Sequence, residues 1–136
     1  MMSKKDSTGV DLDTLATSVR DQEAGRAVDI LIAGQAIGLT IVVAGQDSER
    51  YRKAWRAEVK ALVEAGSLDA MTAEDDDAMK RRVAAGAVIS WSPDPVLGGE
   101  ARPCTRENAL MAFNAIPAIF DQCYGAMLDR EGFTKR

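Results

Sequence analysis

The stretch AVDILIAGQAIGLTIVVAGQDSER, residues 27–50, decides the fold. It holds two runs in which apolar residues recur at every second position, separated by a segment with Gly34 and Gly38. Such alternation on both sides of a turn is typical of a β-hairpin with one apolar face. The residues expected on that face are Val28, Ile30, Ile32, Leu39, Ile41 and Val43.

A helix is predicted directly after the hairpin, within GQDSERYRKAWRAEVKALVEAG at residues 45–66. Asp47 or Ser48 can accept hydrogen bonds from the unpaired N–H groups of its first turn. Gly66 suits the position that follows its last turn. Apolar residues at helical spacing form one stripe, which we expect to face the core. That stripe contains Tyr51, Trp55, Val59, Leu62 and Val63.

A second helix is predicted within MTAEDDDAMKRRVAAGAVISW, residues 71–91, with Thr72 as its N-cap. The i+4 spacing of Met79, Val83 and Ala87 predicts that it continues to near Ser90. The acidic run at residues 74–77 has no calcium-loop spacing, and negative charge stabilises a helix N-terminus. We therefore interpret this run as the helix start, and no metal site is expected.

The stretch ISWSPDPVLGGEARPCTRENAL, residues 89–110, contains three of the four prolines. Proline fixes φ and removes a backbone donor, which discourages both helix and sheet. Apolar helix ends flank the stretch, and neither half of the chain has enough sequence to bury a core alone. We interpret it as a stiff connector inside one domain. The residues expected to act as structural anchors are Tyr51, Trp55, Trp91 and Pro103.

Two further helices are predicted after the connector. Thr105 can cap the first, and Pro117 suits the first turn of the second. Apolar and aromatic residues at i, i+3 and i+4 spacing give these helices a wide stripe. The stripe either faces the core or docks onto a partner. The partner-contact candidates chosen from it by position are Leu110, Phe113, Ile119, Phe120 and Met127.

These elements predict an α+β fold, in which an N-terminal β-hairpin packs on a mostly helical domain of about four helices. Residues 1–22 are predicted to be a flexible arm or a short helix, and residues 23–136 a single domain. A two-stranded hairpin leaves both outer edges unpaired. Pairing of those edges with another copy favours a homo-oligomer.

Composition narrows the function classes. The 136 residues carry a net charge of −4, and no basic cluster exceeds Lys80-Arg81-Arg82, so nucleic-acid binding is not expected. No apolar run approaches the roughly 20 residues of a membrane span. The chain has no histidine, which removes histidine triads and most zinc sites. Cys104 and Cys123 match no zinc or redox spacing and are predicted to be free thiols. We expect no catalytic residues, no cofactor and no enzyme activity.

Three segments together resemble the tail assembly chaperones of long-tailed (siphovirus-type) bacteriophages and prophages. The first is GQAIGLTIVVAGQDSERYRKAWR at residues 34–56, a hairpin that runs into G-x-D-S-x-x-Y. The second is AAGAVISW at residues 84–91. The third is GGEARPCTRENALMAFNAIPAIFDQ at residues 98–122, with a Thr-capped x-x-E-N-A followed by Ile-Pro-x-Ile.

The resemblance implies a non-catalytic chaperone in the host bacterial cytoplasm. Such a protein binds and solubilises the tape measure protein and hands it to tail tube protein subunits. It is absent from the mature virion. The partners expected from the resemblance are thus the tape measure protein, the tail tube protein and further copies of the chain.

Two other interpretations remain open at the level of sequence. A structural tail or head-tail connector protein that stays in the virion has a similar composition. A small enzyme or ligand-binding domain requires convergent ionisable groups in a polar pocket, and the sequence offers no such constellation.

Overall fold

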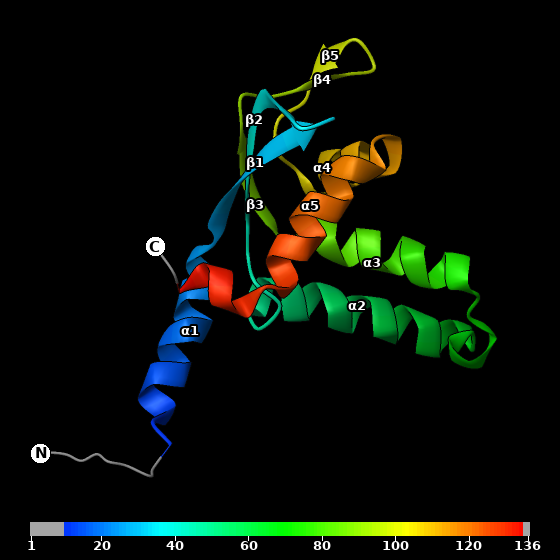
Figure 1. Cartoon of the computed structure of the whole chain (residues 1–136). Coiled ribbons are helices and arrows are strands. Elements are labelled where there is room, and N and C mark those ends of the chain that lie inside the picture. The colour runs from blue at the N-terminus through cyan, green and yellow to red at the C-terminus, as the bar shows by residue number, and fades with distance from the viewer. Residues whose placement is uncertain (1–9, 135–136) are drawn as a thin grey trace, which may run out of the picture.

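An antiparallel sheet and five α-helices make up the computed structural model, which describes residues 10–134 (Figure 1). The sheet has the order β1-β2-β3, with β1 at Arg26–Ile32, β2 at Gln35–Val43 and β3 at Val88–Ser92. The helices are α1 (Leu12–Ala24), α2 (Glu49–Ala65), α3 (Ala73–Ala87), α4 (Arg106–Ala115) and α5 (Pro117–Leu128). A ribbon of β4 (Val96–Leu97) and β5 (Glu100–Ala101) and two 3-10 turns, η1 (Leu68–Ala70) and η2 (Arg130–Phe133), complete it. The predicted α+β class with an N-terminal hairpin is confirmed.

The hairpin of β1 and β2 has the apolar face that its alternation predicts. Ile30, Leu39, Ile41 and Val43 are buried, and Val28 and Ile32 pack half-buried against them. The two strands join at Ala33 and Gly34, whose φ angles of 52° and 78° are both positive. Two successive positive φ angles are typical of the tight turns that match the twist of a hairpin.

The prediction that the second helix continues to near Ser90 is wrong. Helix α3 ends at Ala87, and Val88–Ser92 form strand β3 against β2. Thr40 pairs with Ser92 and Ile41 with Trp91. Over a single turn, the i+4 spacing of apolar residues cannot distinguish a helix from a strand. The free edge of β2 favours a strand, because pairing satisfies the backbone N–H and C=O groups of that edge.

The argument that both hairpin edges stay unpaired is also corrected. β3 takes one edge, and the side chain of Gln122 on α5 binds the other. Its Oε1 accepts from the Leu31 N–H at 2.8 Å, and its Nε2 donates to the Leu31 carbonyl at 2.8 Å. An amide that offers one donor and one acceptor thus replaces a neighbouring strand at this position. In the described sheet β1 and β3 are the outer strands, so pairing of an outer edge with another copy stays a prediction.

Helix termini follow the sequence signals closely. Thr72 and Asp75 form a reciprocal capping box at the start of α3. Asp76 of the same turn pairs with Lys80 at 2.9 Å, so the acidic run serves the helix. The other predicted termini that the structure confirms are Ser48, Gly66, Thr105 and Pro117.

Helix α1 projects from the body and is tied to it at its C-terminal end (Figure 1). The buried Gln22 side chain donates from Nε2 to Asp47 Oδ2 at 2.9 Å and accepts from the Asp47 N–H at 2.8 Å. Arg130 of η2 holds the same carboxylate at 2.6 and 3.0 Å. For residues 1–22 the helix alternative is therefore found from Leu12 onward, while residues 1–9 lie outside the described part.

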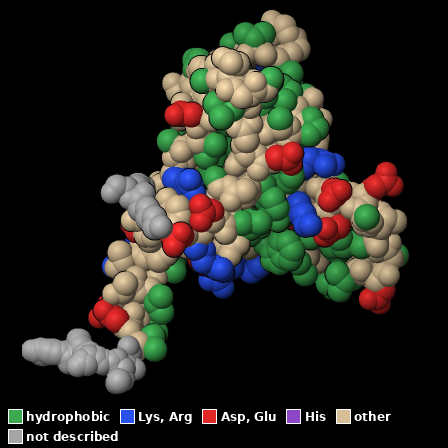
Figure 2. Space-filling model, viewed as in Figure 1, with side chains coloured by type: hydrophobic (Ala, Val, Ile, Leu, Met, Phe, Trp, Pro, Cys, Tyr) green, Lys and Arg blue, Asp and Glu red, His purple; other side chains and the backbone are tan. Residues whose placement is uncertain are grey.

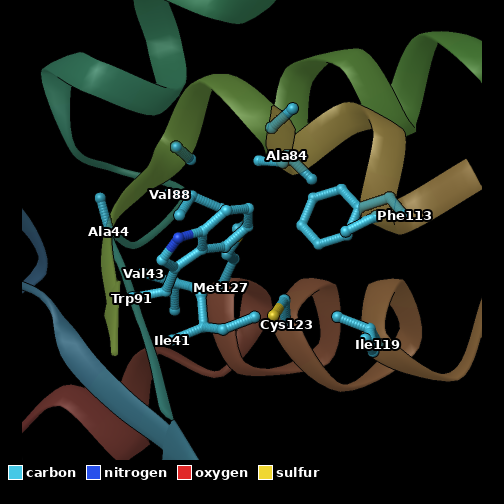
Figure 3. Packing of buried hydrophobic residues seen from close by; sticks show 14 of the residues in the cluster. Ile41, Val43, Ala44, Ala84, Val88, Trp91, Phe113, Ile119, Cys123 and Met127 are labelled. Carbon is cyan, nitrogen blue, oxygen red and sulfur yellow. The ribbon is translucent and has the colours of Figure 1, made fainter. Parts of the chain in front are cut away.

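The core lies between the sheet, α3, α4 and α5. Figure 3 shows Trp91 of β3 beside Val88 and Met127, with Phe113 of α4 facing it across the core. Phe133 of η2 is fully buried, and the Arg26 guanidinium lies 5.6 Å from its ring centre. The sequence analysis did not identify Phe133 as a core residue.

The proline-rich connector forms a defined ribbon. Gly98 and Gly99, with φ of 67° and 82°, make the two-residue turn between β4 and β5. Trp91 Nε1 donates to the Arg102 carbonyl at 3.0 Å, and Arg102 Nε donates to the Leu97 carbonyl at 2.9 Å. These bonds attach the ribbon to the sheet and thereby set where α4 begins.

Candidate interaction surfaces

Of the five predicted partner-contact residues, three are buried and two are half-buried. Phe113, Ile119 and Met127 are buried, with exposed fractions of 1%, 3% and 0%. Their side chains point into the core in Figure 3, so the assignment of these three as contact residues is corrected to core packing. The physical reason is that α4 and α5 turn this side of the stripe toward the sheet and α3. Leu110 and Phe120 are half-buried and remain accessible.

Aromatic rings lead from the core to the surface along α5. Phe120 meets the buried Phe113 edge to face, with ring centres 5.6 Å apart. On its other side it stacks on Tyr124 at 5.1 Å, with the planes 16° apart. Edge and offset-stacked contacts of this kind favour one ring orientation. Phe120 is therefore held in place while part of it stays exposed.

A cleft opens beside this aromatic series, between α3 and the α4–α5 pair. It measures about 640 Å³, within the range of sites that bind a side chain or small molecule. Arg81 Nε donates to Asn114 Oδ1 at 2.7 Å across its mouth. We call it the aromatic cleft; it is lined by Asp77, Arg81, Phe113, Asn114, Pro117, Phe120 and Asp121. Its lining mixes apolar surface, chiefly from Pro117 and Phe120, with side chains of both charges, which suits an apolar side chain with polar neighbours.

Of the four predicted structural anchors, two are buried and two are exposed. Tyr51 and Trp91 are buried, as expected. Trp55 is 40% exposed, so its assignment as a core anchor is wrong. The reason is that α2 turns Ala54 toward α3, where Gly86 allows close approach; a Cβ at Gly86 would lie 2.8 Å from the Ala54 Cβ. Pro103 is exposed, and it acts through its carbonyl, which accepts from Asn108 Nδ2 at 2.9 Å.

Trp55 instead borders a hollow of about 400 Å³ at the start of α2. The hydrogen bond from Arg130 holds the pKa of Asp47 below its ordinary value. Burial, with Tyr124 nearby, raises the pKa of the Tyr51 hydroxyl, which therefore stays neutral. The hollow is lined by Gln46, Asp47, Tyr51, Arg52, Trp55, Arg56 and Arg130. Arg56 and Arg130 are paired with Glu49 and Asp47, whereas Arg52 and the Trp55 indole favour an acidic or aromatic contact.

A third and larger groove, of about 720 Å³, runs between α2, the end of α3 and the start of α4. We call it the basic groove. Its floor is made of small and apolar residues, Ala54, Ala57, Val88 and Ile89 among them. Arg50, Lys53 and Arg106 form its rim, with Glu23 at one end and Cys104 within it. The sequence analysis missed this groove because small residues on a helix carry no strong periodic signal.

Helix α1 presents an apolar stripe that the body does not cover. The exposed fractions of Leu12, Leu15 and Val19 are 70%, 55% and 38%. Figure 2 shows hydrophobic side chains along one side of this projecting helix. Contiguous exposed apolar side chains at helical spacing indicate an interaction surface. The sequence contained this signal in the weak periodicity of residues 12, 15 and 19.

Both cysteines are free thiols. Burial raises the pKa of Cys123 to about 12 and also raises that of Cys104. A thiol that stays protonated is a poor nucleophile.

Comparisons of the chain with protein-family models, with curated proteins and with solved structures found no match.

Proposed function

We propose that this protein is a tail assembly chaperone of long-tailed bacteriophages or prophages. It binds the tape measure protein without catalysing a reaction, keeps it soluble, and passes it to tail tube subunits. The single observation that carries the proposal is the aromatic cleft, where the rigidly held Phe120 is presented beside a polar rim.

The cleft has the chemistry that such a client requires. The tape measure protein implied by the resemblance has long helices with apolar faces. A helix in a groove is recognised by a few apolar anchors, with polar residues around them. Phe120 and Pro117 offer the apolar contact, and Asp77, Arg81 and Asp121 surround it with both signs of charge. Leu110, half-buried on α4, is the second apolar contact retained from the sequence prediction.

The segments that carry the resemblance support the proposal by their position. They form β2 with the start of α2, the end of α3 with β3, and the β4–β5 turn with α4 and most of α5. Together they supply β2, most of β3, part of the core and the C-terminal part of the cleft. The resemblance therefore concerns the framework that presents Phe120 and Leu110.

The protein acts in the host cytoplasm in this proposal, and it leaves before the virion is complete. Within residues 10–134, no helix has the length and apolar character that crossing a membrane requires. Mass spectrometry of purified virions separates the proposal from a connector protein. The chaperone is expected to be absent, and an abundant signal in intact particles would favour the structural alternative.

Co-expression with the tape measure protein tests the binding activity. We expect the soluble yield of the client to rise with the wild-type chain, and the two proteins to co-purify. Phe120→Glu should abolish this gain, because it places a charge on the aromatic floor. Val63→Glu is the matched control, since Val63 is 59% exposed on α2 and lies outside the cleft.

Circular dichroism and urea unfolding of each variant show whether it is folded, which makes the yields comparable. If the wild-type chain neither raises the yield nor co-purifies, the proposed function fails. If it does both and Phe120→Glu behaves like Val63→Glu, the function stands and the cleft is not the client site.

A further inference from the structure

Helix α1 and the basic groove are complementary surfaces that do not meet within one molecule. The apolar stripe of α1 is exposed, and only Glu23 at its last turn reaches the groove. The groove offers an apolar floor of small residues under a positively charged rim. The groove therefore offers an apolar surface that the exposed apolar side chains of α1 can contact.

Charge supports the match. Outside the groove of its own copy, α1 with its N-cap carries three acidic residues, Asp11, Asp13 and Asp21, and a single basic one, Arg20. The rim of the groove carries Arg50, Lys53 and Arg106. Opposite charges around an apolar centre speed association and fix its orientation.

The shapes also agree. Gly86 and Ala54 bring α2 and α3 close together, so the part of the floor between these two helices is lined by small residues. Leucine and valine side chains on an incoming helix can pack into such a floor, as ridges pack into grooves between helices. The stripe of α1 supplies Leu12, Leu15 and Val19 at that spacing.

We propose that α1 of one copy docks in the basic groove of a second copy. Docking within one molecule is opposed by the attachment of α1. Gln22 is fully buried, and its amide forms two hydrogen bonds with Asp47. Swinging α1 across its own groove would break both. The proposal does not rest on the proposed function, because it uses neither the aromatic cleft nor a client.

The donor and acceptor surfaces are different patches, which limits the assemblies that can form. Two copies that exchange α1 reciprocally give a closed dimer. If the exchange is not reciprocal, the same contact produces rings or open chains. In each case the contact joins α1 of one copy to the groove of another.

Sedimentation velocity with purified full-length chain tests the contact. We expect the wild-type chain to associate from the low micromolar range upward, and more weakly as salt rises. Leu15→Glu should raise the dissociation constant about 10- to 100-fold, the equivalent of losing one buried leucine contact. Lys53→Glu should weaken association in the same direction, and Val63→Glu, an exposed site outside both surfaces, should leave it unchanged.

Cross-linking then identifies the contact. One tagged copy carries Ala16→Cys together with Cys104→Ser, and a second copy of different mass keeps Cys104 in its groove. Ala16 is exposed on the stripe side of α1, whereas the native Cys123 is buried and does not compete. A bifunctional maleimide should join the two different copies, and Cys104→Ser in the second copy should remove that product.

Three results would overturn the proposal. One is a wild-type chain that stays monomeric throughout. Another is a chain that associates but whose dissociation constant changes no more with Leu15→Glu and Lys53→Glu than with the control Val63→Glu. The last is an associated chain in which no maleimide product links the α1 thiol to Cys104.

Discussion

The attachment of α1 through Gln22 can be tested by replacing this residue with leucine, which keeps its size and removes both hydrogen bonds. The Asp47 N–H then loses its acceptor in a partly buried setting, which costs about 1–3 kcal/mol. The bond from Gln22 Nε2 to the Asp47 carboxylate is lost as well. It contributes toward the lower end of about 1.5–3 kcal/mol, because the Asp47 side chain is 32% exposed and keeps Arg130.

We therefore expect Gln22→Leu to lower the free energy of unfolding by about 2–4 kcal/mol, a large part of the roughly 5–15 kcal/mol of a typical domain. With a urea slope of about 2 kcal/mol/M, the middle of the usual range, the unfolding midpoint should fall by about 1–2 M. Hydrogen exchange adds a local measurement, in which the Asp47 amide should lose its protection.

Gln122→Leu is the matched control, since this glutamine also accepts from one backbone N–H through Oε1 and donates through Nε2, in its case to the carbonyls of Leu31 and Ala118. Its partners are exposed, so water replaces the lost bonds and the cost should stay below about 1 kcal/mol. If Gln22→Leu costs no more than Gln122→Leu, burial of the Gln22 amide does not secure α1, and the reasoning is refuted.

Three further predictions concern packing, thiols and acid. Gly86→Val should lower the free energy of unfolding, measured in urea, by about 1–3 kcal/mol, because its Cβ would lie 2.8 Å from a side chain of α2. Gly125→Ala is the contrasting variant: Gly125 has open space around it, so alanine should raise the free energy of unfolding by about 0.5–1 kcal/mol. An aromatic disulfide reagent should modify Cys104 in the native protein and Cys123 only after unfolding, and equal rates would contradict the burial of Cys123. The pKa of Asp47 is lowered from 3.8, so its contribution to stability is complete at neutral pH and is lost as pH falls through the folded value. Asp47→Asn should therefore flatten the decline of stability below about pH 5, as followed by unfolding at a series of pH values.

Signals that reside in one segment could be predicted from the sequence. The caps at Ser48, Thr72 and Thr105 depend on a hydroxyl that lies next to its own helix, and all three are confirmed. The alternating hairpin is equally local. Its turn at Ala33-Gly34 was less predictable, because Gly38, which has a positive φ as well, lies inside β2.

Features that depend on distant partners could not be predicted. Val88–Ser92 become a strand because β2 offers an open edge, and no local pattern announces this. Trp55 stays exposed because α2 is rotated by a contact between two small residues. The basic groove arises only when three helices meet, and the aromatic cleft was only half anticipated, since Phe120 was expected and its polar rim was not.

The amide of Gln122 on the edge of β1 also has a consequence in time. Leu31 and Gln122 are 91 positions apart, and ribosomes add about 5–20 residues per second. Leu31 on the outer edge of the hairpin is thus made about 5–18 s before the side chain that binds its backbone. Edge strands exposed during synthesis are sites of wrong pairing between chains. During that interval, wrong pairing of the edge must be prevented by the twist of the hairpin, by early contacts with α2 and α3, or by a cellular chaperone. Slowing translation between residues 92 and 122 would lengthen the exposure and should lower the soluble yield of the protein.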